Sequence, residues 1–277
     1  MASIEDQMTA VYVFVDDSLK AHPQYAGFRT SPNRNPAFSD AEVITIALMQ
    51  GCLGVPTLKQ AYRIIAYSYR SAFPKLPSYQ QWIARLRPLG AAIGGIVLGA
   101  LAEHDMPAHL YIFDSKPIPV CKPIRHGRVR LLREDGAYFG KNKAGWYFGF
   151  KLHVIVHHTG AVLGAILTPA NCDDRDPALA LALSVPGGVA LGDLGYSGPE
   201  IAQTLLEEAE LLLITRKVAS ERRVLISSVR QRVETTFSGL WSHFVDRVYS
   251  RSWNGLWNAI RLKLAYFNLC QAGIIPA

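Results

Sequence analysis

Residues 146–168, WYFGFKLHVIVHHTGAVLGAILT, decide the fold class of this chain. The first part, Trp146 to Val156, is rich in β-branched and aromatic residues, which favour strands. Thr159-Gly160 predicts a tight turn, and residues 161–168 predict the returning strand of an antiparallel hairpin. A hairpin of this kind needs further strands to complete a sheet and helices to cover it.

Three further apolar runs predict buried strands on either side of the hairpin. They are HLYIFDS (109–115), VALGD (189–193) and LLLIT (211–215). Helices are predicted after Pro177, from Pro199 as the first helical residue, around Glu234, and over residues 253–270. The order strand, hairpin, helix, strand, helix, strand, helix is typical of an α/β fold with a mixed sheet. The last helix has an apolar stripe, and we expect it to pack mainly against the sheet.

The first hundred or so residues predict only helices. Capping boxes begin at Ser39 and Ser78, where a serine is followed three positions later by Glu42 or Gln81. The helices are expected over residues 1–21, 41–50, 57–72 and from 78 to about 103, with an interruption at a proline. The chain thus divides into an all-helical domain, residues 1–105, and an α/β domain, residues 106–277. A short connection at residues 50–57, QGCLGVPT, makes this domain a candidate helix-turn-helix domain, which would bind DNA ends if the partner is DNA; a role in dimerisation or in packing between domains is the alternative.

Composition narrows the class of protein. Of the 277 residues, 49% are hydrophobic and 18% charged, which excludes a largely disordered chain. The net charge of +7 and the pI of 9.3 favour an anionic partner, and nucleic acid is the first candidate. The four cysteines are widely spaced, so no zinc ribbon is predicted. An acidic N-terminus and short apolar runs lead us to expect a soluble, cytoplasmic protein that does not bind a membrane.

Three carboxylates are candidates for chemistry. Asp114, in YIFDSKPIPV, and Asp193, in VALGDLGYSG, each end a predicted strand. Strand ends in α/β sheets line the crevice where ligands bind, so the two would share a cation such as Mg²⁺; alternatively, each only caps a turn. Glu234, in SVRQRVETTFSGLW, lies beside an apolar helical stripe, with Arg230 four residues earlier. This pair is either a helix ion pair or a third metal ligand beside a phosphate-binding arginine.

Other polar residues receive structural interpretations. Asp173, Asp174 and Asp176, in PANCDDRDP, predict a turn and a helix cap rather than a calcium loop. His153 falls in the hairpin, but neither HExxH nor a cysteine partner is present to predict a zinc site. We interpret three residues near the strand ends as turn or positioning residues: Ser115, Tyr196 and Ser197.

The motifs FDS, WYFGFKLH, LTPAN, GDLGYSG and RxxxExxFSxL, in this order over residues 109–270, resemble the DDE transposases of bacterial insertion sequences. The resemblance implies an RNase H-like mixed sheet flanked by helices and preceded by an all-helical domain. It also implies that Asp114, Asp193 and Glu234 form the metal-binding catalytic triad.

One branch of that superfamily has an arginine four residues before the glutamate, and Arg230 matches it. The same branch has a tyrosine and a lysine where this chain has Ser227 and Trp241. The finer subgroup is therefore not assigned.

The chemistry of that family implies a DNA transposase that cuts the 3′ ends of its element and joins them to a target. Both steps are in-line displacements at phosphorus, for which the resemblance implies two Mg²⁺ ions, with Mn²⁺ as a substitute. The implied partners are double-stranded DNA, as element ends and target, and a second copy of the chain in a homodimer on DNA. Two alternatives stay open: an RNase H-like endonuclease without strand transfer, and a catalytically inactive DNA-binding relic.

Basic residues flank the proposed carboxylates in the sequence. Residues 116–151 hold nine Lys and Arg against two acids, and residues 214–263 hold ten against three. We expect residues 116–145 to be irregular, with RHGRVRLLR (125–133) either a solvated loop or a phosphate-binding surface. Lys151 alternatively pairs with a carboxylate of the sheet. The residues predicted to bind DNA are Lys116, Arg125, Arg128, Arg130, Lys151, Arg230 and Arg232.

Overall fold

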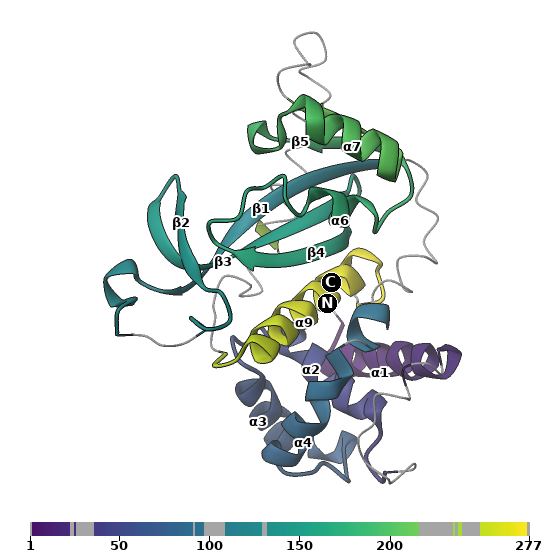
Figure 1. Ribbon diagram of the computed structural model, residues 1–277. Coiled ribbons are helices and arrows are strands. Elements are labelled where there is room, and N and C mark those ends of the chain that lie inside the picture. Colours follow the sequence, from purple (N-terminus) through teal and green to yellow (C-terminus); the bar gives the residue numbers. More distant parts are fainter. Residues whose placement is uncertain are drawn as a thin grey trace. The chain divides into compact units, whose positions relative to one another are not determined.

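The computed structural model describes residues 2–22, 25, 36–90, 92–96, 109–128, 132–215, 235, 238–239 and 250–275. The chain forms two compact units. The first consists of Met1–His104, Ser242–Phe244 and Asn254–Ala277, and the second of Asp105–Trp241 and Val245–Trp253. The described residues of the first unit are helical, and those of the second build a sheet with helices (Figure 1).

The helices of the first unit are α1 (Ile4–Ala21), α2 (Asp40–Cys52), α3 (Leu58–Ser68), α4 (Tyr79–Leu86) and, from its second residue on, α9 (Trp253–Gln271). Two of them, α2 and α4, begin at the capping residues that the sequence predicts. The capping boxes at Ser39 and Ser78 are confirmed, because each serine hydroxyl accepts from the backbone N–H three residues later. Helix α4 ends at Leu86, and a 3₁₀ turn over Arg87–Leu89 follows, which agrees with the predicted interruption at Pro88.

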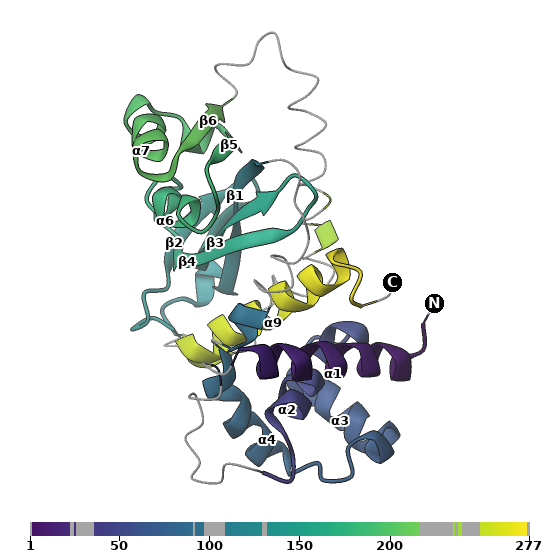
Figure 2. The same ribbon diagram turned by 90° about the vertical axis from the view of Figure 1, so that its right-hand side faces the viewer.

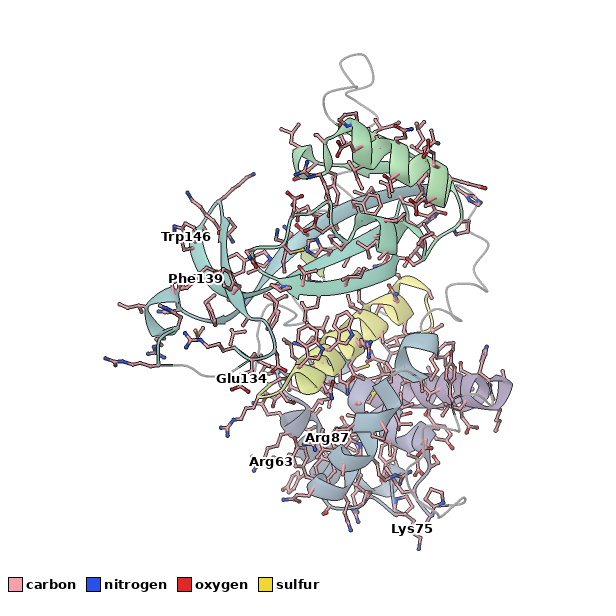
Figure 3. All side chains as sticks on the ribbon, viewed as in Figure 1. Arg63, Lys75, Arg87, Glu134, Phe139 and Trp146 are labelled. Carbon is pink, nitrogen blue, oxygen red and sulfur yellow. The ribbon has the colours of Figure 1, made fainter. Side chains whose placement is uncertain are left out.

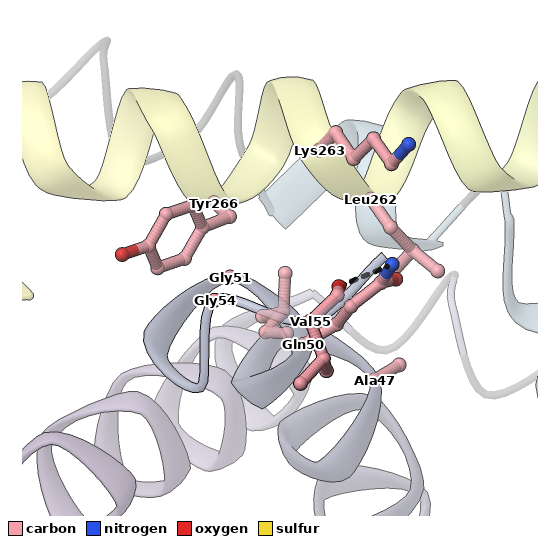
Figure 4. A pocket seen from close by; sticks show the side chains of 9 residues that line it. Ala47, Gln50, Gly51, Gly54, Val55, Leu262, Lys263 and Tyr266 are labelled. Carbon is pink, nitrogen blue, oxygen red and sulfur yellow. Dashed lines mark hydrogen bonds between the residues drawn. The ribbon is translucent and has the colours of Figure 1, made fainter. Parts of the chain in front are cut away.

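Helix α9 contacts helices of the first unit. A Cβ added at Gly51, near the end of α2, would lie 2.3 Å from Cγ of Tyr266, so only glycine lets this ring approach. Gln50 and Lys263 help to line a small pocket at this contact, where Gln50 Nε2 donates to the Val55 carbonyl at 3.2 Å (Figure 4). We expected the last helix to pack mainly on the sheet, but its residues from Asn254 onward cluster with the helical unit. An apolar stripe indicates that a helix is buried, not which surface buries it.

The second unit contains a six-stranded mixed sheet. Its strands are β1 (Leu110–Cys121), β2 (Tyr138–Asn142), β3 (Gly145–His157), β4 (Val162–Pro169), β5 (Gly188–Gly192) and β6 (Leu211–Thr215). The order along the sheet is β2-β3-β1-β5-β6, and β4 also pairs with β3. Strands β1, β5 and β6 are parallel, whereas β3 is antiparallel to its three partners. The predicted RNase H-like mixed sheet is therefore confirmed.

Strand β1 is longer than the sequence suggested. We expected it to end at Asp114–Ser115 and the following residues to be irregular, but it pairs with β3 as far as Cys121. Pro117 and Pro119 made this stretch read as a loop. The Leu110 carbonyl accepts from the N–H of His158, just after β3, and the His109 carbonyl accepts from the N–H of Val189 on β5. Even-numbered residues of β1 therefore hydrogen-bond toward β3, and odd-numbered residues face β5. The two prolines, also odd, therefore face the β5 side, where pairing stops at Ile112 and no N–H is needed.

Two helices pack against the strands of this sheet. Helix α6 (Ala178–Ala182) contacts β3 and β4, α7 (Pro199–Ala209) contacts β6, and the two helices contact each other (Figure 2). Pro199 is the first residue of α7, as predicted. The helix predicted around Glu234 lies almost entirely outside the described residues. Among the helices that the structure describes, none is both long and apolar enough to span a membrane.

Candidate active site

Asp114 and Asp193 come from neighbouring parallel strands. The last paired residues of β1 and β5 are Ile112 and Leu191, and the two aspartates lie two positions further along each chain. Asp193 keeps an extended backbone (φ −78°, ψ −173°), so the strand direction continues to it. Because residues two apart on a strand share a face, both carboxylates leave the same face of the sheet at the same level.

Each aspartate also caps the backbone that follows it. Asp114 Oδ1 accepts from the Ser115 N–H at 2.7 Å, and Asp193 Oδ1 accepts from the Gly195 N–H at 2.9 Å. The second bond starts the 3₁₀ turn Leu194–Tyr196. The capping role considered from the sequence is therefore real. It fixes the orientation of each carboxylate and is compatible with metal binding through the same group.

The chemistry of these two groups fits a hard divalent cation. Mg²⁺ binds one or two carboxylates and keeps several waters, and Asp114 and Asp193 are half-buried carboxylates on adjacent strands. Within the described ranges, no group of three His, Cys, Asp or Glu side chains is arranged to hold a metal ion. The third predicted ligand, Glu234, lies outside those ranges, as do three predicted DNA-binding residues: Arg130, Arg230 and Arg232.

A further carboxylate, Asp174, lies close to the backbone that carries this pair. Its Oδ1 accepts from Ser115 Oγ at 2.9 Å and from Lys151 Nζ at 3.1 Å. Lys151 also donates to the Cys172 carbonyl at 2.8 Å. It therefore pairs with an acid, but this acid lies on the loop after β4 and not in the sheet. Asp174 carries no sequence signal that separates it from its acidic neighbours, and we had assigned it to the turn with them.

The two neighbouring aspartates do serve the turn. Asp173 forms an ion pair with Arg175 at 2.8 Å, which holds the pKa of its carboxyl well below its usual range. Asp176 Oδ2 accepts from the Asp173 N–H at 3.2 Å. The turn prediction therefore describes Asp173 and Asp176, while Asp174 turns toward the sheet.

His153 lies on β3 beneath Asp174 and is completely buried. Its Nε2 lies 2.9 Å from Thr168 Oγ1, whereas its Nδ1 lies 3.6 Å from Asp174 Oδ1, beyond hydrogen-bond length. Burial lowers the pKa of His153 to about 4 and outweighs the attraction of Asp174. The ring is therefore neutral near pH 7, and its contact with Asp174 is not an ion pair there.

Tyr196 is the buried centre of this region. Its side chain is 1% exposed, and its ring stacks on Phe113 at 5.4 Å between centroids. Burial raises the pKa of its phenol, and the charges of Asp174, Asp114 and Asp193 raise it further. All three carboxylates therefore lie close enough to Tyr196 to affect the pKa of its phenol. Its hydroxyl has no hydrogen-bond partner among the described residues.

The predicted DNA-binding residues that the structure describes are not equivalent. Lys116 is half-buried on β1, two residues beyond Asp114 and therefore on the same face of the strand. Arg125, at the end of the 3₁₀ turn Pro123–Arg125, and Arg128 are exposed to solvent. Lys151 forms the ion pair with Asp174 described above.

The hairpin of β2 and β3 adds two residues that the sequence reading did not single out. Lys141 and Trp146 are directly opposite each other, with the Lys141 ammonium 5.7 Å from the centre of the Trp146 ring. Trp146 is 62% exposed, and it is labelled on the hairpin with Phe139 in Figure 3. A lysine over an exposed aromatic ring offers both a phosphate contact and a surface on which a base can stack.

Comparison with known proteins finds one family whose model matches part of the chain. Residues 105–237 match the family described as transposase DDE domain. This segment contains Asp114, Asp193 and Glu234, together with Asp174. The chain has no significant match among curated proteins or among solved structures.

Proposed function

We propose that this protein is a DNA transposase that cleaves the 3′ ends of a DNA element and joins them to target DNA, because residues 105–237 match the transposase DDE domain family. The register of β1 and β5 carries the proposal, because it brings Asp114 and Asp193 to neighbouring positions within the matched segment. Glu234, in the same segment, is proposed as the third acidic residue of the site.

The proposed cofactor is Mg²⁺, for which Mn²⁺ substitutes. The three carboxylates would hold two ions, whose chemistry when bound is to polarise the attacking and leaving oxygens of an in-line displacement at phosphorus. The residues orient the phosphodiester in the same way for both steps, because only the nucleophile differs: water in cleavage, and the freed 3′-hydroxyl in joining. No serine or tyrosine of the chain is needed as a covalent nucleophile.

DNA is the proposed substrate and partner, with element ends held by two copies of the chain. Support comes from the exposed Arg125 and Arg128, and from Lys116 beside the carboxylates. Lys151 bonds to Asp174 and to the Cys172 carbonyl on the face of the sheet opposite Asp114, so its contact with DNA remains a sequence-based proposal. Arg130, Arg230 and Arg232 remain sequence-based proposals.

A cleavage and strand-transfer assay tests the function. Duplex DNA carrying an element end, taken from the sequence flanking the gene, is incubated with the protein and Mg²⁺ or Mn²⁺. We expect metal-dependent nicking at the element boundary and joining of the new 3′-hydroxyl. Asp193→Asn should lose both activities and still bind DNA, whereas Asp173→Asn, an exposed aspartate of the same unit, should keep both.

Each other result selects a different function. Cutting without joining would favour the endonuclease. DNA binding without metal-dependent cutting by the wild-type protein would contradict the catalytic triad and favour an inactive relic. Equal activity of the Asp193→Asn variant and the wild-type protein would contradict the role of Asp193.

A further inference from the structure

Asp174 touches the chain segments that follow both aspartates of the site. Its Oδ1 accepts from Ser115 Oγ, and Ser115 is the residue after Asp114. Its Oδ2 lies 2.8 Å from the point where a Cβ on Gly195 would stand, and Asp193 Oδ1 lies 3.0 Å from that same point. One side chain thus bonds to the residue after Asp114 within β1 and lies close to the turn that follows Asp193.

The contact with β1 is made from the face opposite Asp114. Ser115 pairs with His153 and Pro117 pairs with Lys151, so Ser115, His153 and Lys151 share one face of the sheet. Successive residues of a strand point to opposite faces, so Asp114 leaves the other face. Asp174 therefore does not compete with Asp114 for a ligand. It supports β1 from the face of the sheet opposite Asp114.

The charges around Asp174 suit a structural brace. Asp174 and Lys151 are both largely buried, with 22% and 19% of their side chains exposed, so their ion pair is partly shielded from water. Lys151 compensates the charge of Asp174, which would otherwise repel the nearby carboxylate of Asp193. The bond of Lys151 to the Cys172 carbonyl ties the same ammonium to the loop that carries Asp174.

We propose that Asp174 is a positioning residue of the active site, which holds β1 at Ser115 and the turn that follows β5, so that Asp114 and Asp193 stay at the separation that a shared divalent cation requires. The inference rests on the proposed function. Asp174 acts through Ser115 and through the turn at Gly195, and it does not touch the DNA. Asp173 and Asp176, on the same loop, have no contact of this kind.

The test compares five proteins: wild type, Asp174→Ala, Ser115→Ala, the double variant of these two, and Asp173→Asn as the matched control. Three quantities are measured below the unfolding temperature of every variant. They are the single-turnover cleavage rate at saturating DNA, the dissociation constant for the DNA duplex, and Mn²⁺ binding to the DNA-free protein by electron paramagnetic resonance.

Displacement of an active-site group by a fraction of an ångström is expected to slow cleavage by about 10- to 100-fold in Asp174→Ala. DNA affinity should stay within about twofold, and Mn²⁺ binding should weaken, because the change affects the carboxylates and not the DNA surface. Ser115→Ala should shift both quantities in the same direction. The double variant should lose less than the product of the single effects, since both residues act through one hydrogen bond. Asp173→Asn should match wild type.

Asp174→Asn keeps an oxygen that accepts from Ser115, and it should therefore restore part of the rate lost in Asp174→Ala. This variant also keeps the inference testable if Asp174→Ala does not fold. An active wild type whose rate and Mn²⁺ affinity are unchanged by either substitution at 174 would overturn this inference alone. The inference would also be overturned if the rate loss in the double variant equalled the product of the losses in the two single variants. A folded wild type that binds DNA but neither binds Mn²⁺ nor cuts would overturn the proposed function and this inference with it.

Discussion

At the scale of single residues, His153 makes stability depend on pH. Its pKa is about 4 in the folded protein, below the ordinary value of 6.5, so between these values the unfolded chain binds a proton that the folded chain does not. Stability is complete above about pH 6.5 and falls as the pH drops toward 4. At pH 4.5 the loss should be about 2–3 kcal/mol. Urea unfolding at pH 7 and pH 4.5 measures it.

His153→Gln is the control for this effect, because glutamine keeps a polar contact for Thr168 and does not titrate. The difference in unfolding free energy between the two pH values should be smaller in this variant by the amount assigned to His153. An equal difference in both proteins would mean that other groups cause the pH dependence.

The residues of the site differ in how well the sequence predicts them. Asp114 and Asp193 could be named as candidates because each comes at or near the end of an apolar run, a pattern that is local in the chain, and their role in metal binding stays a prediction. Asp174 could not, since its partners Ser115 and Lys151 are 59 and 23 residues away and only strand pairing brings them together. Glu234 lies outside the described residues, and its role stays a prediction.

At the scale of secondary structure, the pairing of β1 with β3 depends on Gly149. A Cβ at this position would lie 2.3 Å from the Ile118 carbonyl oxygen and 2.8 Å from the Val120 nitrogen, beside the irregularity between Pro119 and Cys121. Backbone atoms cannot move away as a flexible side chain does. Gly149→Ala should therefore lower the free energy of unfolding by about 1–3 kcal/mol, measured by thermal or urea unfolding.

Gly127 supplies the control, because a Cβ there meets no atom within 4 Å. Gly127→Ala should leave the unfolding free energy within about 0.5 kcal/mol of wild type. If Gly149→Ala were equally harmless, the close approach of β1 to β3 would not exist in solution.

The elements themselves were largely predictable where the signal is local. The capping serines fixed the starts of α2 and α4, and the apolar run 211–215 coincides with β6. The errors came where tertiary pairing overrides local preference. Two prolines hid the second half of β1, and residues 138–142 became a strand because β3 extends far enough to pair with them.

At the scale of the whole molecule, the charge of +7 predicts DNA binding that weakens steeply with salt. Each arginine that neutralises a phosphate contributes about one unit to the slope of log affinity against log salt concentration. Arg125→Ala and Arg128→Ala should each reduce that slope by about one, measured by fluorescence anisotropy with a labelled duplex. Affinity for different sequences should fall alike, because phosphate contacts carry no sequence information.

Lys20 is the control for these two arginines. It is exposed, but Asp16 compensates it at 2.6 Å, so Lys20→Ala should not change the slope. A slope that stays the same in both arginine variants would place the DNA on another part of the surface.

The prolines of β1 also bear on how the protein behaves at high concentration. An unpaired strand edge exposes backbone N–H groups that can pair with a strand of another molecule, and such pairing often starts aggregation. Beyond Ile112 no described strand pairs with β1 on the β5 side, and Pro117 and Pro119 remove two donors from that edge. A neighbouring chain would find no continuous ladder there. The same two residues that conceal the strand in the sequence thus help to keep separate copies of the protein from joining sheet to sheet.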